Sequence, residues 1–270
     1  MNLVRSELLK IRTTSTWWLL GIGAFLATAL AFAINAWLAH QVLSGNGEDF
    51  GVSGDQAAAP AQAANLYTSG QYLGLLFVML IGILMVTNEF FHQTATTTFL
   101  TTPRRTSVIL SKLGAASLLG FGFWLATTVI DLVAGSIFLT LDGHGTQLGE
   151  WTVHRALLLN LLAYAIWTIL GVGIGTLIPN QLGAVITAAV LYLVGTQVVQ
   201  LLFFLLSGWL DSQAVVKWQV VWPAVASQVM ISGGSTELTP DWWVGALVLV
   251  GYALVSGVFG VLITRRRDIS

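Results

Sequence analysis

Six long apolar stretches, separated by short polar segments, dominate the hydrophobic pattern of the chain. Each reaches the roughly 20 residues that an α-helix needs to cross the hydrocarbon core of a bilayer. A helix satisfies its own backbone hydrogen bonds there, and the stretches are too uniformly apolar for barrel strands. The pattern therefore predicts an all-α integral membrane protein, a single transmembrane domain over 1–270. Its six transmembrane helices are expected at 17–39, 66–87, 113–141, 157–178, 182–206 and 242–264.

Composition agrees with lipid as the solvent for most of the surface. Of the 270 residues, 56% are hydrophobic and only 9% are charged, whereas soluble domains carry about 25% charged residues. Cysteine is absent, which excludes disulfides, thiolate catalysis and Cys-ligated metal sites. The first stretch has no small-residue cleavage site, so we expect a retained span rather than a signal peptide.

The basic residues are divided unequally between the two sides of the predicted membrane. With the amino terminus inside, the cytoplasmic side receives nine of the eleven Lys and Arg residues, and only Arg155 and Lys217 lie outside. An excess of Lys and Arg in cytoplasmic loops sets the orientation of membrane proteins. We therefore expect a multi-pass protein of the cell membrane with both termini in the cytoplasm.

Three segments outside the spans have distinct characters. Before the first span, one helical face carries Leu3, Val4, Leu8 and Ile11, and the basic residues Arg5, Lys10 and Arg12 lie elsewhere on the wheel. This predicts an amphipathic helix in the inner interface; an ordinary positive flank is the alternative. Residues 41–65 show no periodicity and predict an irregular outer loop. Residues 207–241 are too apolar for a solvated loop, yet Lys217 and Pro223 interrupt them. Short helices that re-enter the outer leaflet before the sixth span are expected there.

The cytoplasmic segment 88–105 joins the second and third spans. Thr102 followed by Pro103 predicts a helix start, because the hydroxyl can cap a free N–H and proline fits the first helical position. That helix would continue through Lys112 into the third span. The aromatic and threonine residues before it suit a short helix along the membrane face. The alternative is a loop whose arginines merely touch lipid phosphates.

The chain resembles permease subunits of ABC transporters of the ABC-2 type. The resemblance rests on the six spans, segment 88–105, the Ser-Glu-Leu-Leu-Lys stretch at 6–10 and the Ile-Pro-Asn-Gln-Leu-Gly-Ala turn at 178–184. The resemblance covers nearly the whole chain. It implies an amino-terminal elbow helix and, after the second span, a coupling helix that sits in a groove on an ATPase subunit. In this chain His92-Gln93-Thr94 stands where the resemblance implies an His-Gly-Thr-like pattern, so Gln93 replaces the expected glycine. The contact residues implied for the ATPase subunit are Glu89, His92, Arg104 and Arg105.

The sequence predicts no ATP site in the chain itself. A P-loop needs a lysine after a glycine, and none of the lysines, Lys10, Lys112 and Lys217, follows one. We therefore expect a non-enzymatic chain without a cofactor. The resemblance implies two cytoplasmic ATPase subunits that bind ATP and Mg²⁺, and a second copy or a homologous permease. Membrane lipids are the other expected partners, and nucleic acid is not expected. The predicted cargo of this exporter is hydrophobic or amphipathic: a lipid, a drug or a peptide.

Asp131 is the one ionisable residue well inside a predicted span. A carboxylate at the centre of a bilayer costs at least about 2.5 kcal/mol on insertion scales, so it is a candidate for the translocation path or for gating. The other interpretation is a structural role in helix packing, in which Asp131 is hydrogen-bonded to Thr127, Thr128 or a polar group on another helix. The alternative function is a proton- or ion-coupled secondary transporter with Asp131 as its coupling site.

Other chemistry has little support in the sequence. No histidine pair has the spacing of a helical zinc site, and no Gly-x-Ser-x-Gly elbow is present, so neither a metal centre nor an intramembrane enzyme is expected. The glycines of 171–175 permit close helix contact. Interhelical hydrogen bonding is expected of the polar residues within spans, Asn35, Asn160, Gln197 and Gln200.

Overall fold

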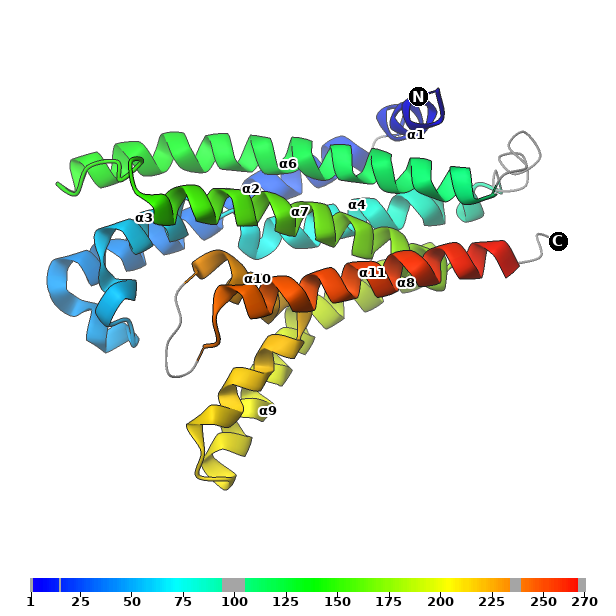
Figure 1. Cartoon of the computed structure of the whole chain (residues 1–270). Helices are drawn as coiled ribbons and strands as arrows, with labels where there is room; N and C mark the ends of the chain where they lie inside the picture. The colour runs from blue at the N-terminus through cyan, green and yellow to red at the C-terminus, as the bar shows by residue number, and fades with distance from the viewer. Residues whose placement is uncertain (1, 15, 94–104, 234–238, 267–270) are drawn as a thin grey trace.

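The computed structural model describes residues 2–14, 16–93, 105–233 and 239–266, and every regular element in these residues is helical. This confirms the predicted all-α class. The long helices lie side by side in one bundle, and α1 (Asn2–Arg12) lies across one of its ends (Figure 1). Helix α11 (Trp242–Arg266) finishes at that same end (Figure 1), which we call the α1 end.

Within the described residues, six helical segments are long and apolar enough to cross a membrane, as the hydrophobic pattern predicts. Each predicted stretch falls on one of them. The third is continuous with the helix predicted to run through Lys112, since α6 (Arg105–Leu141) continues without interruption for 37 residues. The six segments are Trp17–Phe50, Ala59–Phe91, Thr106–Leu141, Trp151–Leu177, Gln181–Trp209 and Trp242–Gly260.

The second span is broken, and the region before it is more ordered than the sequence predicts. After α2 (Thr16–Gln41), the expected irregular loop 41–65 is largely helical, so that prediction is wrong. Tertiary packing explains the difference, since Leu66 and Tyr67 are fully buried and Tyr67 lies against Gly135. A turn separates the two halves of the span. The elements are η1 (Val42–Asn46), η2 (Gly47–Phe50), η3 (Gly54–Ala57), α3 (Ala59–Tyr67) and α4 (Gln71–Phe91).

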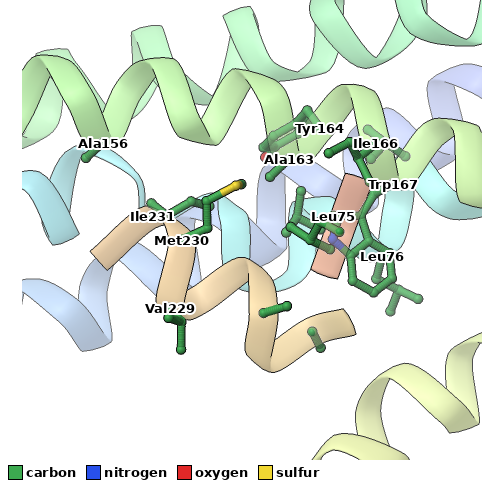
Figure 2. Packing of buried hydrophobic residues seen from close by; sticks show 14 of the residues in the cluster. Leu75, Leu76, Ala156, Ala163, Tyr164, Ile166, Trp167, Val229, Met230 and Ile231 are labelled. Atoms are coloured by element: carbon green, nitrogen blue, oxygen red, sulfur yellow. The ribbon is translucent and has the colours of Figure 1, made fainter. Parts of the chain in front are cut away.

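The core lies where α4 and α7 (Trp151–Leu177) pack together, with α10 against α7 (Figure 2). Figure 2 shows Tyr164 and Trp167 of α7 beside Leu75 of α4. Glycine makes the close approach possible. A Cβ atom on Gly171 would overlap the carbonyl oxygen of Met79. The predicted close helix contact at 171–175 is confirmed: Gly171 and Gly175 face α4, and Gly173 faces Ser256 of α11.

The fifth span has few neighbours within the chain. It consists of α8 (Gln181–Val190), a π-helical turn η4 (Leu191–Gly195) and α9 (Thr196–Trp209). Only 6% of its most hydrophobic stretch is buried. Figure 1 shows α9 projecting away from the other long helices. Large apolar side chains on several sides of α9, including Leu201, Phe204 and Trp209, are therefore exposed by the chain alone.

The segment before the sixth span forms a bent helix pair. η5 (Gln213–Val221) and α10 (Pro223–Ser232) meet at 106°. The bend has a local cause: a residue before proline disfavours the helical region, and Trp222 is extended. Two indole N–H groups fix the pair, from Trp222 to Thr196 Oγ1 at 3.0 Å and from Trp167 to Ser227 Oγ at 2.6 Å. Short helices are thus confirmed between the fifth and sixth spans.

Candidate functional site

A cluster of four charged side chains, three of them buried, lies at the α1 end. Its centre is Lys112 of α6, only 4% exposed, whose Nζ lies 2.7 Å from Glu7 Oε2 of α1 and 2.9 Å from Glu89 Oε1 of α4. The same Nζ also donates to the carbonyl oxygen of Met85 at 3.1 Å. One ammonium group therefore connects three helices that are far apart in the sequence.

Lys10 completes the charge cluster, which we define as Glu7, Lys10, Glu89 and Lys112. Its Nζ donates to Glu7 Oε1 at 2.8 Å and to Glu89 Oε1 at 2.6 Å. Burial alone would lower the pKa of Lys10, but the hydrogen bonds and negative charges of the two glutamates outweigh it, so that pKa is raised above 10.5. Because the pKa is raised, Lys10 is charged at neutral pH and its stabilising contribution is lost only in strongly alkaline solution.

The apolar face of α1 brings Glu7 to this position. Val4, Leu8 and Ile11 pack against a small core that includes Met85 of α4 and Ala115 of α6. Glu7 lies on the same side of the helix and is carried inward with them. Two positive and two negative charges balance in the charge cluster, which is the condition under which buried ions are tolerated. The cluster therefore fastens α1 to both helices that flank segment 88–105.

The residues predicted to contact an ATPase subunit are placed differently from one another. The Glu89 carboxylate points inward and is only 6% exposed, whereas His92, at the end of α4, is exposed beside Phe91. Arg104 lies outside the described residues, as does the predicted helix start at Thr102. Arg105 begins α6, and its side chain is not among those described.

Gln93 has a backbone conformation that favours glycine. Its φ is 55°, in the left-handed region, and its N–H donates to the carbonyl oxygen of Phe90 at 3.2 Å. A left-handed residue just after a helix is a common helix ending, and glycine usually occupies it. The glycine expected at this position from the resemblance is thus consistent with the backbone.

Asp131 lies where the second span breaks. Its Oδ2 accepts a hydrogen bond from the backbone N–H of Gly70 at 2.8 Å, and the residue is 1% exposed. The Tyr164 hydroxyl donates to the carbonyl oxygen of Gly70 at 3.1 Å and lies 3.1 Å from Thr127 Oγ1. Asp131 therefore supplies an acceptor to a free amide at the start of α4, where helices leave such groups unpaired.

Sequence reasoning missed Glu7, Lys10 and Lys112 as members of one site. A lysine at the start of a long apolar helix is a signal that could have indicated Lys112. Its partner Glu7, however, is 105 residues away. In the part of the chain that the structure describes, no group of three or more His, Cys, Asp or Glu side chains could hold a metal ion.

A family model described as "ABC-2 family transporter protein" matches residues 3–195. The chain belongs to this family. The match runs from α1 into the fifth span, so it includes the charge cluster, the broken second span and Asp131. No curated protein matches the chain. Membership identifies the chain as the membrane subunit of an ABC-2 transporter, a multi-pass protein of the permease kind predicted from the resemblance.

Proposed function

We propose that this ABC-2 protein is the permease of an ATP-driven exporter, powered by two separate ATPase subunits that bind ATP and Mg²⁺. The observation that carries the proposal is the charge cluster. It joins the end of α4, the beginning of α6 and the amino-terminal helix into one unit at the α1 end. A force applied to segment 88–105 would reach all three helices together.

The α1 end is the cytoplasmic end in this proposal. Nine of the eleven Lys and Arg residues lie before the first predicted span, between the second and third, or after the sixth, which are the segments at this end. The positive-inside rule places such segments in the cytoplasm. The bundle also places α1 and the end of α11 on one side (Figure 1), as an even number of spans demands. α1 then acts as the elbow helix, and segment 88–105 docks on the ATPase subunit through His92, Arg104 and Arg105.

Glu89 has an indirect role in this mechanism. Because its carboxylate is held by Lys10 and Lys112, it transmits the displacement of the docking segment to α1 and α6. Closure of the ATPase subunits on ATP would push the docking segment, and the fastened helices would tilt as a group. Such a tilt would switch the spans between inward-facing and outward-open states.

A second permease, identical or homologous, would cover the fifth span. Helix α9 exposes apolar side chains on several sides, and lipid alone gives it no fixed position. Helices associate in membranes by close van der Waals packing rather than by hydrophobic exclusion. We assign the path for the cargo to the space between the two copies, bordered by this span.

The cargo is expected to have a hydrophobic part. A cavity of about 360 Å³ lies between α7, α8 and α11, and nearly all of its lining is apolar. Its size falls within the range of small-molecule sites, about 300–1,000 Å³. Leu177, Leu191 and Phe259 at this cavity are about half exposed, so an acyl chain or an apolar drug could enter from the lipid.

The proposal is tested by purifying the tagged chain from membranes of its own host and identifying bound proteins by mass spectrometry. We expect an ABC ATPase to co-purify, and the His92→Ala variant to reduce its recovery several-fold. The matched control is His154→Ala. His154 is also exposed, but it lies in the first turn of α7, at the end of the bundle opposite to α1. Recovery of no ATPase with the wild-type chain would overturn the proposal.

A further inference from the structure

A second cavity, of about 260 Å³, lies at the end of the bundle opposite to α1. It is enclosed by α2, η3, α3, the start of α4, α9 and the bent pair of η5 and α10. We call it the glutamine cavity. Its amide-bearing lining residues are Gln56, Gln62, Asn65, Gln71, Gln200, Gln219 and Gln228.

The lining of the glutamine cavity combines polar with apolar side chains, and its described part carries no charge. Among its described lining residues there is no Asp, Glu, Lys, Arg or His, while Thr68, Ser232 and Thr239 add hydroxyl groups. Each amide side chain offers an oxygen that accepts and a nitrogen that donates two hydrogen bonds. This lining contrasts with the apolar cavity between α7, α8 and α11. A ligand here would be recognised by neutral hydrogen bonds rather than by charge.

Two of the glutamines hold a buried acceptor without a partner. Gln62 and Gln71 are 7% and 4% exposed, and the Oε1 atom of each makes no hydrogen bond. The nitrogen of each is already used: Gln62 Nε2 donates to the carbonyl oxygen of Gln56 at 2.7 Å, and Gln71 Nε2 donates to Thr68 Oγ1 at 3.3 Å. Each amide is thus held by one hydrogen bond of its nitrogen, and its buried oxygen has no donor.

Leaving such a buried acceptor unpaired is unfavourable, because the oxygen has lost its hydrogen bonds to water without gaining a replacement. The last torsion of glutamine is broad, so a small rotation of either amide can direct its oxygen toward a group in the cavity. A ligand that supplies O–H donors would therefore relieve this cost at two positions. The same ligand would also need acceptors for the amide nitrogens and hydroxyls of the remaining wall.

We propose that the glutamine cavity binds an uncharged polyhydroxyl group, of the size of a single sugar residue. Sugar hydroxyls both donate and accept, which matches a lining of amides and hydroxyls with two free acceptors. Phosphates and carboxylates have no cation to meet in the described lining. A metal cation would find no carboxylate there, and hard cations in proteins usually have one.

The binding does not depend on the proposed ATP-driven function, so it can be tested on the full chain alone in lipid nanodiscs. Saturation-transfer NMR would measure the probes glucose and N-acetylglucosamine against glucose 6-phosphate. We expect binding of the two neutral sugars, and at least 10-fold weaker binding by the charged one. The double variant Gln62→Met/Gln71→Met should weaken sugar binding about 10-fold, as expected for two lost hydrogen bonds.

Gln197→Met is the matched control, because Gln197 also lies on α9 but does not line the cavity. Gln200→Met, on the same helix and at the cavity, tests the site with little risk to folding and should weaken binding severalfold. Equal sugar binding by the Gln200→Met and Gln197→Met variants would overturn the proposal. So would tighter binding of a neutral dipeptide amide than of either sugar, which would assign the cavity to peptide.

Discussion

The second and fifth spans have the same mean hydropathy but opposite surroundings. Of the most hydrophobic stretch of each, 72% is buried in the second span and 6% in the fifth. In the second span, Gly74 and Gly82 lie against Tyr164 and the backbone of α7. In the fifth, a Cβ atom on Gly208 would meet nothing within 4 Å. Hydropathy thus indicates that a helix lies in the membrane, while small residues and polar contacts determine which helices it packs against.

The comparison also separates the roles of the two regions. The second span is anchored at one end by the charge cluster and at its break by Asp131. The fifth is held by packing of α8 against α4 and of α9 against η5, and near its middle by the bond from Trp222 to Thr196. A transporter that changes conformation needs both a rigid element and a loosely attached one. Substitutions in the second span and at its anchors should therefore destabilise the chain more than substitutions in the fifth span.

The largest effect is expected from Lys112→Met in the charge cluster. Removing this ammonium leaves Glu7 and Glu89 buried with only half-exposed Lys10 to balance them. Breaking a buried ion pair in this way costs about 3–5 kcal/mol. A fall in the melting temperature of the purified chain in detergent would measure it. Lys217→Met at the opposite end, where no described residue forms an ion pair with Lys217, should change stability by less than about 0.5 kcal/mol.

Gly171→Ala should have the next largest effect. The added Cβ overlaps the backbone oxygen of Met79, which cannot rotate away, so α4 and α7 must separate. Overpacking of this kind costs about 1–3 kcal/mol. Gly208→Ala in α9 has open space and should be neutral or slightly stabilising. Equal losses from both substitutions, measured by thermal unfolding, would remove the contrast between the two spans.

Asp131→Leu should destabilise the chain by about 1–3 kcal/mol, because the Gly70 N–H loses its acceptor in a buried site. Asp131→Asn keeps a carbonyl oxygen at this position and should be milder. Transport assays distinguish the two functions considered from the sequence. If the Asp131→Asn variant still transports, and this transport needs ATP and survives collapse of the proton gradient, Asp131 has a helix-packing role. Complete loss of transport by this folded variant would favour a proton-coupled mechanism.

The smallest effect is expected at the end of α4. Gln93→Gly should stabilise the chain by about 1 kcal/mol, since a non-glycine residue in the left-handed region is strained by roughly that amount. Thermal unfolding measures the gain. His92→Gly is the neighbouring control, because the φ of His92 is −91° and glycine has no advantage there. A loss of stability in both variants would contradict the assigned conformation.

Much of this fold could be predicted from the sequence, because hydrocarbon imposes one simple requirement on each span. The six stretches, the helix across 2–12 and the bent pair before the sixth span all follow from apolar length, periodicity and proline. The break near Gly70 had a signal in the sequence, the polar run Thr68-Ser69-Gly70-Gln71, but the predicted span 66–87 extended across it. The order in 41–65 had no such local signal, since it depends on how the neighbouring Leu66 and Tyr67 are buried.

The candidate site was less predictable than the spans. Asp131 was identified by type, since a carboxylate in an apolar helix is rare, and of the partners considered, Thr127, Thr128 or a polar group on another helix, it is the last that the structure shows. The group that meets it is a backbone amide, which every residue except proline carries and which no pattern indicates. Likewise, nothing local in the sequence pairs Lys112 with Glu7.

Helix α6 also has a mechanical consequence. Its 37 residues correspond to about 55 Å of unbroken rod, nearly twice the thickness of the hydrocarbon core, about 30 Å. Lys112 and Asp131 lie on this rod about 28 Å apart, at 1.5 Å per residue. A pivot of only about 5° at one tip would displace the other by about 5 Å over this length. A small displacement at the α1 end would thus reach the opposite end of the bundle through one continuous helix.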